Sequence, residues 1–405
     1  MNKADLLKRL SQQVIETPSW GFQDSGTRFG IFPQPWAAKT LEEKFQDAGQ
    51  VQKYTGICPT VALHIPWDRC DDWNKASAMA TQYGVKIGAI NPNVFQDKDY
   101  QFGSICHKDE RVRQKAIQAH LDCIDIAKAT NSDSISLWFA DGSNYPGQDD
   151  FRERKHRMQD SLSTVYKALP KGMRMLIEYK FFEPAFYHTD IADWGCSILL
   201  CQKLGDQAEV LVDTGHHAQG TNLEHIVAIL LDEGRLGGFH FNSRKYADDD
   251  LTVGSINPYE LFLIYNELVG AEEEGDARTK ACAKRVAYMF DQCHTHKPTV
   301  EAIIQSAVTV QETYCKALQV DRAALKKARQ NGDIVGAEEV LKDAYNSDCR
   351  PLLKEWRESK NMNPEPLKAF RTSGYTDKMT AERQKRRQAA AAQTQGATMA
   401  AGFPT

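Results

Sequence analysis

Short apolar runs alternate with longer amphipathic stretches through the first three quarters of the chain. Runs such as VALHI, MLIEY and VLVDT are apolar almost throughout, which is typical of strands covered on both faces. Between them lie helix-length stretches such as DERVRQKAIQAHLDCIDIAKAT and NLEHIVAILLDEGR. The pattern predicts eight strands, at Trp20–Gln23, Val61–Ile65, Lys86–Ile90, Ser134–Trp138, Met175–Tyr179, Val210–Thr214, Gly238–Asn242 and Tyr288–Gln292.

Repeated strand–helix units predict an α/β fold with a parallel sheet, and eight of them predict a closed (β/α)₈ TIM barrel. An open doubly wound sheet is the alternative, but no G-x-G-x-x-G follows the first strand and no P-loop occurs. The barrel and a leading N-terminal helix take residues 1–297. Residues 298–375 are predicted to form an all-helical extension that serves oligomerisation. Residues 376–405 are rich in Arg, Gln, Ala, Thr and Gly, which predicts a frayed helix and a flexible tail.

The charge balance narrows the choice of partners. Lys and Arg number 50 against 54 Asp and Glu, a net charge of −4, which disfavours nucleic acid and anionic membranes. No apolar run approaches the roughly 20 residues that span a bilayer, and the start lacks the apolar core of a secretory signal. The ten cysteines contain no C-x-x-C pair, which favours reduced thiols. We therefore expect a cytoplasmic protein.

Four metal-type side chains end four consecutive predicted strands: Glu178, Asp213, His240 and Asp291. The carboxyl ends of barrel strands converge on one mouth, where active sites of this fold lie. Three carboxylates and an imidazole meeting there without a cation would repel and lose hydration, at a cost of roughly several kcal/mol. A divalent cation removes this cost, and Mn²⁺, Mg²⁺, Co²⁺ and Zn²⁺ all suit the set. Taken singly, such residues are more often helix caps or ion-pair partners.

A second donor set lies on the loops that follow these strands. His216 belongs to the turn TGHHAQGT, while Asp248 and Asp250 belong to the loop YADDDL. Two cations side by side could then share a carboxylate, one positioning a substrate and the other polarising it. The run ADDDL alone would be read as a helix N-cap. His217 and His225 are interpreted as ordinary surface or supporting histidines.

Aromatic and basic residues near the predicted mouth suggest a pocket. Trp67, Trp138 and Phe182 either pack in the core or form the apolar wall of a sugar site, and His64 stands near the end of the second strand. Lys180 follows Glu178 by two residues and so points into the barrel. It either neutralises carboxylates or stabilises charge developing at a carbonyl.

At these residues the chain resembles the L-rhamnose isomerase family, in particular its broad-specificity bacterial branch, the L-rhamnose isomerase/sugar isomerases. The resemblance extends from residue 26 to residue 294 and follows the predicted strand ends. The stretches that carry it are GTRFGIFPQPW (26–36), ALHIPWD (62–68), SLWFADGSNYPGQ (136–148), IEYKFFEPAFYHTD (177–190), VLVDTGHHAQGTN (210–222), GFHFNSRKYADDDLTVGS (238–255) and MFDQCH (289–294).

The resemblance implies a metal-dependent aldose–ketose isomerase, usually a homotetramer, with two divalent cations per subunit, foremost Mn²⁺. It implies that Glu178, Asp213, His240 and Asp291 hold a structural, substrate-binding cation, and that His216, Asp248 and Asp250 hold a catalytic one. Trp138, His64 and Lys180 match substrate-pocket positions. Phe29 matches a residue that reaches a neighbouring subunit's pocket. Lys180, His216, Asp291 and His64 are thus the expected catalytic residues.

The expected reaction converts L-rhamnose to L-rhamnulose and related sugars, such as D-allose and D-psicose. A hydride shift between C1 and C2 and a proton abstraction through an enediol both fit, and the metal pair favours the hydride shift. Two other functions fit the residues. A metal-dependent phosphodiester hydrolase needs a basic groove that the net charge disfavours, and a non-catalytic sugar-binding barrel would keep two ligand sets without chemistry.

Overall fold

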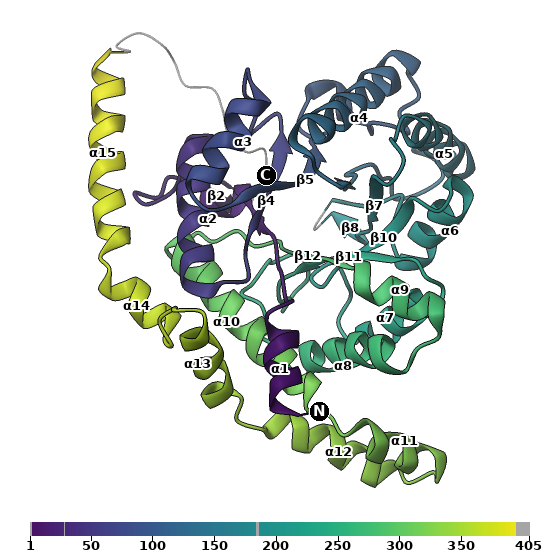
Figure 1. Ribbon diagram of the computed structural model, residues 1–405. Coiled ribbons are helices and arrows are strands. Elements are labelled where there is room, and N and C mark those ends of the chain that lie inside the picture. The colour runs from purple at the N-terminus through teal and green to yellow at the C-terminus, as the bar shows by residue number, and fades with distance from the viewer. Residues whose placement is uncertain (1, 28, 184–185, 394–405) are drawn as a thin grey trace.

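The computed structural model describes residues 2–27, 29–183 and 186–393, and its centre is a barrel of parallel strands (Figure 1). Hydrogen bonds from Glu16 to Tyr288 (N to O, 2.7 Å) and from Phe290 to Glu16 (N to O, 3.0 Å) join the last strand to the first and close the barrel. The predicted (β/α)₈ fold is confirmed. The strands follow one another round the sheet in the order β1 (Thr17–Pro18), β4 (Thr60–Ile65), β5 (Lys86–Pro92), β6 (Ser134–Leu137), β7 (Arg174–Glu178), β10 (Ala208–Asp213), β11 (Leu236–Phe241) and β12 (Ala287–Phe290).

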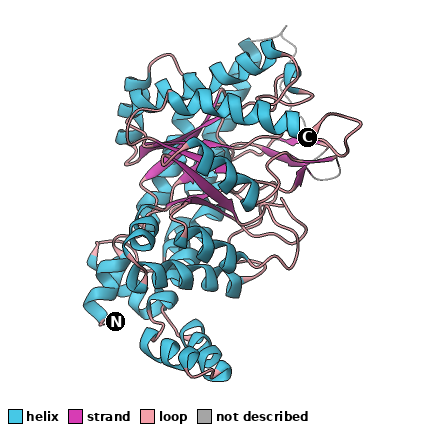
Figure 2. Ribbon diagram, turned by 90° about the vertical axis from the view of Figure 1, so that its right-hand side faces the viewer, coloured by secondary structure: helices cyan, strands magenta, loops and turns pink. Residues whose placement is uncertain are grey.

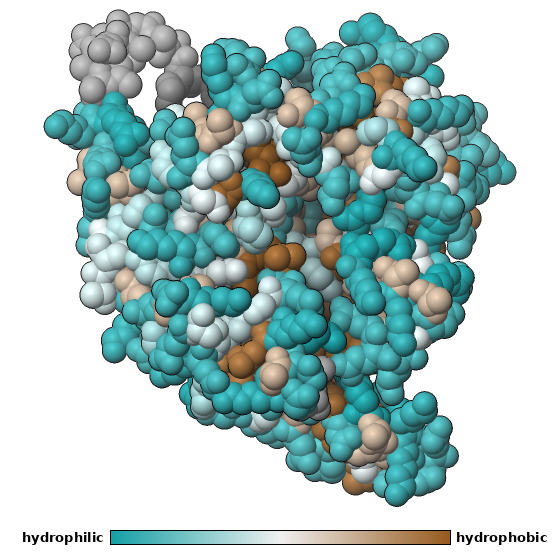
Figure 3. All heavy atoms as spheres, viewed as in Figure 1, coloured by the Kyte–Doolittle hydropathy of each residue, from teal (hydrophilic) through white to brown (hydrophobic). Residues whose placement is uncertain are grey.

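Helices enclose the strands on the outside of the barrel (Figure 2). They are α2 (Leu41–Thr55), α3 (Trp73–Gln82), α4 (Glu110–Thr130), α5 (Phe151–Lys167), α6 (Trp194–Leu204), α7 (Leu223–Asp232), α8 (Pro258–Glu274), α9 (Ala277–Arg285) and α10 (Thr299–Leu318). Several begin at an Asp or Asn whose side chain accepts a backbone N–H of the first turn, as Asp72, Asp150 and Asn222 do. Among them, α6 packs on β10, and α7 and α9 pack on β11; the residues of both strands are all buried. The face shown in Figure 3 is largely hydrophilic, with apolar residues gathered toward its centre.

The first strand is shorter and earlier than the sequence predicts. The predicted strand Trp20–Gln23 is wrong: β1 is Thr17–Pro18, and Ser19–Phe22 form a 3₁₀ helix, η1. Pro18 has no N–H to donate to a neighbouring strand, so the ladder ends there. The other seven predicted strands each overlap an observed one.

Two small hairpins lie outside the barrel sheet. The β2–β3 hairpin joins Ser25–Thr27 to Gly30–Phe32 and follows η1, so it leaves the barrel from the carboxyl end of β1. The β8–β9 hairpin pairs Phe182–Glu183 with Tyr187–His188 and follows β7. Both hairpins therefore leave from the end at which the strands carry the predicted site.

A run of helices follows the barrel, preceded in the chain by the N-terminal helix α1 (Lys3–Leu10). The run comprises α11 (Arg322–Gln330), α12 (Ile334–Asn346), α13 (Arg350–Ser359), α14 (Pro366–Thr372) and α15 (Tyr375–Gln393). The last helix lies within the stretch for which the sequence predicts a flexible tail; residues 394–405 lie outside the described residues. Arg383 of α15 is 2% exposed and forms an ion pair with Asp47 of α2, which accounts for the order of this helix.

The ten cysteines are all free thiols. No helix in the described ranges is long and apolar enough to cross a membrane.

Candidate active site at the barrel mouth

The structure brings the four predicted strand-end residues together. Glu178, Asp213, His240 and Asp291 each offer one ligand atom, and these atoms all lie within 4.8 Å of one another. Nδ1 of His240 lies 3.3 Å from a carboxylate oxygen of Glu178 and 3.3 Å from one of Asp291. Glu178, Asp213 and His240 are buried, and Asp291 is half-buried. The arrangement is a donor set of three carboxylates and one imidazole around a common point.

The second predicted set lies directly beside the first. His216, Asp248 and Asp250 also offer ligand atoms within 4.8 Å of one another. The imidazole of His216 joins the two sets, because its Nδ1 lies 3.1 Å from Glu178 and its Nε2 lies 3.1 Å from Asp248. Glu178 therefore stands between the two donor sets.

The electrostatics of both sets fit divalent cations. Burial raises the pKa of Asp213 to about 6 and raises that of Asp250 well above its usual value. Burial disfavours the charged form of His240, but the Glu178 and Asp291 carboxylates outweigh it and raise its pKa to about 10. Protons thus supply the positive charge that these carboxylates require when no cation is present. An oxygen-rich set with one nitrogen is a common ligand set for divalent metals.

The loop that carries Asp248 and Asp250 is held in a strained conformation. Ala247, Asp248 and Asp250 have φ angles of 100°, 56° and 37°, in the left-handed region. Two backbone hydrogen bonds of 2.8 Å between Ser243 and Leu251 close the loop. This geometry turns both carboxylates toward His216 instead of solvent, at a conformational cost that is typical of functional sites.

Asn242 connects the two donor sets and was not predicted as a site residue. Its amide nitrogen donates to both oxygens of Asp213 (3.0 and 3.1 Å) and lies 3.5 Å from Asp250. Its amide oxygen accepts from the Thr214 hydroxyl. A side chain at Gly215 would come within 2.6 Å of that oxygen, so a glycine keeps the space open. Asn242 immediately follows β11, so it could have been predicted as a site residue from its position just after a strand end.

Replacing Asn242 with leucine should weaken the binding of Mn²⁺ by about 10- to 100-fold, the usual effect of removing a partner that orients a metal ligand. The leucine removes both hydrogen bonds of the Asn242 amide to Asp213, so the backbone N–H of Gly215 alone orients this carboxylate less firmly. Calorimetric titration with Mn²⁺ measures the effect. Asn266→Leu, at a buried asparagine on α8 outside the barrel, is the control and should leave Mn²⁺ affinity unchanged. Equal affinities in wild type and Asn242→Leu would contradict the assignment.

Lys180 lies beside the second donor set. Its ammonium is 2.5 Å from Asp248 and 3.0 Å from Glu183, and it lies 5.0 Å from the centre of the Trp138 ring. Burial disfavours the charge, but Asp248 and Glu183 outweigh it and raise the pKa of Lys180. The side chain therefore stays cationic. Glu183, which the sequence analysis did not single out, lies on the β8–β9 hairpin.

Aromatic rings form a continuous wall next to His64. The His64 ring stacks on Trp67 with centroids 4.1 Å apart, and Phe95 bridges it to Trp138 at 5.7 and 4.8 Å. Trp20 packs edge-on against His64 at 5.4 Å and donates from Nε1 to Asp291 at 2.8 Å. Burial lowers the pKa of His64 to about 4, so its ring is neutral at pH 7.

Two other predicted aromatic residues lie on the hairpins. The Phe182 ring packs against Phe181, at 4.0 Å between centroids. Phe29, which is expected to reach a neighbouring subunit, is 84% exposed at the tip of the β2–β3 hairpin. Trp20 and Phe95 were not predicted as site residues. Phe95 follows β5 by three residues, so the rule that found the acidic residues at strand ends could have found this ring.

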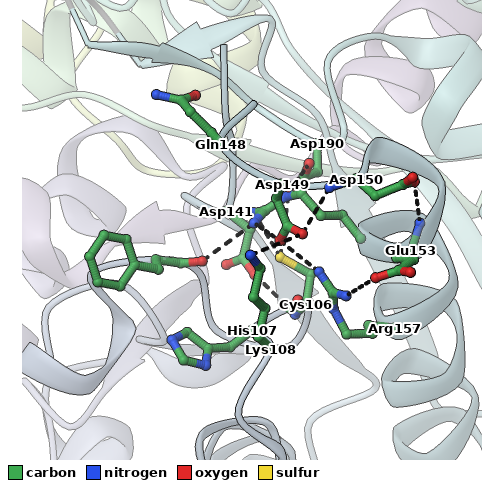
Figure 4. Close-up of polar contacts among 12 residues, drawn as sticks. Cys106, His107, Lys108, Asp141, Gln148, Asp149, Asp150, Glu153, Arg157 and Asp190 are labelled. Atoms are coloured by element: carbon green, nitrogen blue, oxygen red, sulfur yellow. Dashed lines mark hydrogen bonds and ion pairs between the residues drawn. The ribbon is translucent and has the colours of Figure 1, made fainter. Parts of the chain in front are cut away.

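A third cluster of metal-type side chains is already neutralised (Figure 4). Cys106, Asp141 and Asp190 lie together, but the buried guanidinium of Arg154 donates to Asp190 at 2.7 Å and to the Cys106 sulfur at 2.9 Å. Asp141 accepts from the backbone and hydroxyl of Ser104 at 2.7 and 2.6 Å. The arginine fills the place that a cation would need. We therefore interpret this cluster as a set of polar contacts that stabilises the surrounding loops.

The fold and the site together define a class of protein, the (β/α)₈ barrels with carboxylate–histidine donor sets at the mouth. Residues 54–263 match the xylose isomerase-like TIM barrel family. The chain belongs to this family.

Similar proteins agree with this assignment. The chain is 42% identical over 375 residues to a probable sugar isomerase of Rhizobium meliloti (strain 1021), covering 91% of this chain and 86% of the relative. It is 40% identical over 380 residues to a probable sugar isomerase of Mesorhizobium japonicum, covering 93% and 87%.

Solved structures share the fold at low identity. A protein from Sinorhizobium meliloti 1021 is 14% identical, with a TM-score of 0.50 over 75% of this chain and 98% of that one. A D-psicose 3-epimerase solved in the presence of D-fructose is 12% identical, with a TM-score of 0.50 over 76% and 99%.

Proposed function

We propose that this protein is a metal-dependent aldose–ketose isomerase of the L-rhamnose isomerase type. It converts L-rhamnose to L-rhamnulose and acts on related sugars such as D-allose and D-psicose. The observation that carries the proposal is the pair of donor sets joined by His216, next to Lys180 and an aromatic wall. The probable sugar isomerases of 40% and 42% identity support the same chemistry.

The two donor sets would hold two divalent cations, foremost Mn²⁺, with Co²⁺, Mg²⁺ and Zn²⁺ as the alternatives. Glu178, Asp213, His240 and Asp291 would hold one, and His216, Asp248 and Asp250 the other. When bound, such cations supply the Lewis acidity that polarises the sugar oxygens at C1 and C2, which a hydride shift between those carbons requires.

The residues around the donor sets would bind and orient the open-chain sugar. The rings of Trp20, Phe95 and Trp138 exclude water and pack against C–H faces of the sugar. The imidazole of His64 is neutral, and its buried Nδ1 has no hydrogen-bond partner among the described residues, so a sugar hydroxyl that reached this nitrogen would supply the missing partner. The ammonium of Lys180 stabilises negative charge developing on the sugar oxygens.

Turnover of a sugar panel tests this function directly. The purified protein is supplied with Mn²⁺ and with L-rhamnose, L-mannose, L-lyxose, D-allose and D-ribose, and the ketose products are measured. We expect ketose from at least L-rhamnose or D-allose. Binding without ketose formation would favour a non-catalytic sugar-binding barrel, and cleavage of abasic DNA would favour a phosphodiester hydrolase.

We also propose a homotetramer in which helices of residues 298–375 take part in assembly. In this assembly Phe29 reaches the sugar pocket of a neighbouring subunit. The 84% exposure of Phe29 supports this role, because removing a large apolar side chain from water by contact with a neighbouring subunit is favourable.

Replacing Phe29 with alanine should raise KM for the preferred sugar about tenfold, the loss of roughly one buried aromatic contact. The metal content should stay unchanged, because Phe29 lies outside both donor sets. Steady-state kinetics together with elemental analysis measures both quantities. Phe102→Ala, at another exposed phenylalanine (69% exposed), is the control. A KM that stays at the wild-type value for every sugar would count against the role of Phe29 as a cover for the pocket.

A further inference from the structure

The β2–β3 hairpin, which carries Phe29, cannot hold its own position. Its strands have three residues each, and they pair only with one another among the described strands. An isolated two-stranded hairpin is marginally stable in water. The place of the hairpin therefore depends on the segment at its base, residues 33–40, which has no regular secondary structure.

The hairpin begins next to the donor sets. It follows η1, where Trp20 donates to Asp291 at 2.8 Å. Ser25, the first residue of β2, lies beside the thiol of Cys293. Cys293 follows Asp291 by two residues. Movement of the hairpin base would therefore also move residues that border the mouth of the barrel.

Arginines of α15 supply hydrogen bonds to the backbone of the 33–40 segment. Arg387 donates to the carbonyl oxygens of Gln34 (3.1 Å) and Ala37 (2.6 Å). Arg383 donates to the carbonyl oxygen of Trp36. Backbone groups outside helices and sheets need such partners. Side chains of α15 thus donate hydrogen bonds to three carbonyl oxygens of a segment that lies about 350 residues earlier in the chain.

α15 is itself fixed to the barrel at the same place. Arg383 is 2% exposed and donates to both oxygens of Asp47 on α2, at 2.8 and 3.0 Å. Tyr375, at the start of α15, donates to Asp47 at 2.7 Å. A buried bidentate pair of this kind has a single geometry. The helix, the hairpin base and α2 therefore form one rigid unit, on the left side of Figure 1.

We propose that α15 is a strap that positions the β2–β3 hairpin at the mouth of the barrel, and that Arg383 and Arg387 are positioning residues for sugar binding. The proposal rests on the proposed sugar isomerase function for its effect on KM. Its effect on the hairpin itself does not depend on that function.

Arg387→Met tests the strap without disturbing the buried ion pair of Arg383. Lys378→Met is the matched control, because it removes the same charge from the same helix. Within the described structure the Lys378 ammonium contacts the carboxylate of Glu382 and no residue of the 33–40 segment. Hydrogen exchange of the amides of residues 24–40, KM, kcat, metal content and Tm are measured for both variants.

Arg387→Met should speed exchange in residues 24–40 about tenfold, because the segment opens locally more often. KM should rise about tenfold with kcat within about twofold, the signature of lost binding without lost chemistry. Lys378→Met should change neither the exchange rate nor KM. A purely structural role would instead lower Tm without changing KM.

Unchanged exchange in Arg387→Met would overturn the strap, and faster exchange with an unchanged KM would overturn its role in sugar binding. A wild-type protein that converts no sugar would overturn the proposed function. In that case the exchange comparison of the two variants would still decide whether α15 holds the hairpin.

Discussion

Removing divalent cations should abolish ketose formation, and adding Mn²⁺ or Co²⁺ should restore it. Seven donor side chains form two adjacent sets at the mouth, and three of the carboxylates belong to the buried or half-buried first set. Polarisation of a sugar carbonyl by a cation contributes several kcal/mol, so turnover should fall by at least about 10²- to 10³-fold without it. The measurement is L-rhamnose turnover after dialysis against a chelator, with the residual metal determined by elemental analysis.

The same samples provide the control for folding. Circular dichroism should show an intact barrel in the metal-free protein, because the raised pKa values of His240 and His216 keep positive charge beside the carboxylates of the first set. Loss of activity with retained helix content then assigns the effect to the cations. Full turnover in a sample shown to be free of metal would rule out the metal-dependent mechanism.

Asp250→Asn should fold normally, retain one cation per subunit and still bind sugar, but lose about 10²-fold in kcat. Burial raises the pKa of Asp250 well above its usual value, because burial favours the neutral form of this side chain when no cation is present. Asparagine is nearly isosteric with that neutral form. The lost charge therefore weakens the binding of the cation that His216, Asp248 and Asp250 would hold far more than the binding of the other cation.

Asp249→Asn is the matched control for Asp250→Asn. Asp249 stands in the same loop, but it accepts hydrogen bonds from the backbone of Lys245 and Tyr246 and does not belong to either donor set. Metal stoichiometry, sugar binding and turnover are measured for both variants. Near-native kcat in Asp250→Asn, or the loss of both cations together, would refute the division into a structural and a catalytic cation.

The barrel and the position of its donor sets could be predicted because both follow from local patterns. Apolar runs of strand length alternate with amphipathic stretches of helix length, which leads to a parallel sheet, and the presence of eight such units favours a closed barrel. A parallel barrel brings all strand ends to one mouth, so Glu178, Asp213 and His240 converge although 62 positions separate the first from the last. No contact had to be known in advance.

The features that could not be predicted depend on contacts between residues that are far apart in the sequence, and no local pattern indicates which residues pair. Arg383 of α15 is ordered because it meets Asp47, 336 positions away, and a basic stretch near the C-terminal end otherwise indicates a solvated helix. Arg154 neutralises Cys106 and Asp190 through a contact between a helix and two loops. The first strand was misplaced because Trp20 and Phe22 are apolar, whereas Pro18 decides where the hydrogen-bonded ladder ends.

The 33–40 segment can form its contacts with α15 only late in the synthesis of the chain. Arg387 is translated 353 positions after Gln34, whose carbonyl it binds. At about 5–20 residues per second the ribosome needs about 20–70 s to cover that distance. During this time the nascent barrel can already pair its strands, since β12 ends about 100 residues earlier than Arg387. The base of the hairpin is thus among the last parts of the chain to acquire its native contacts.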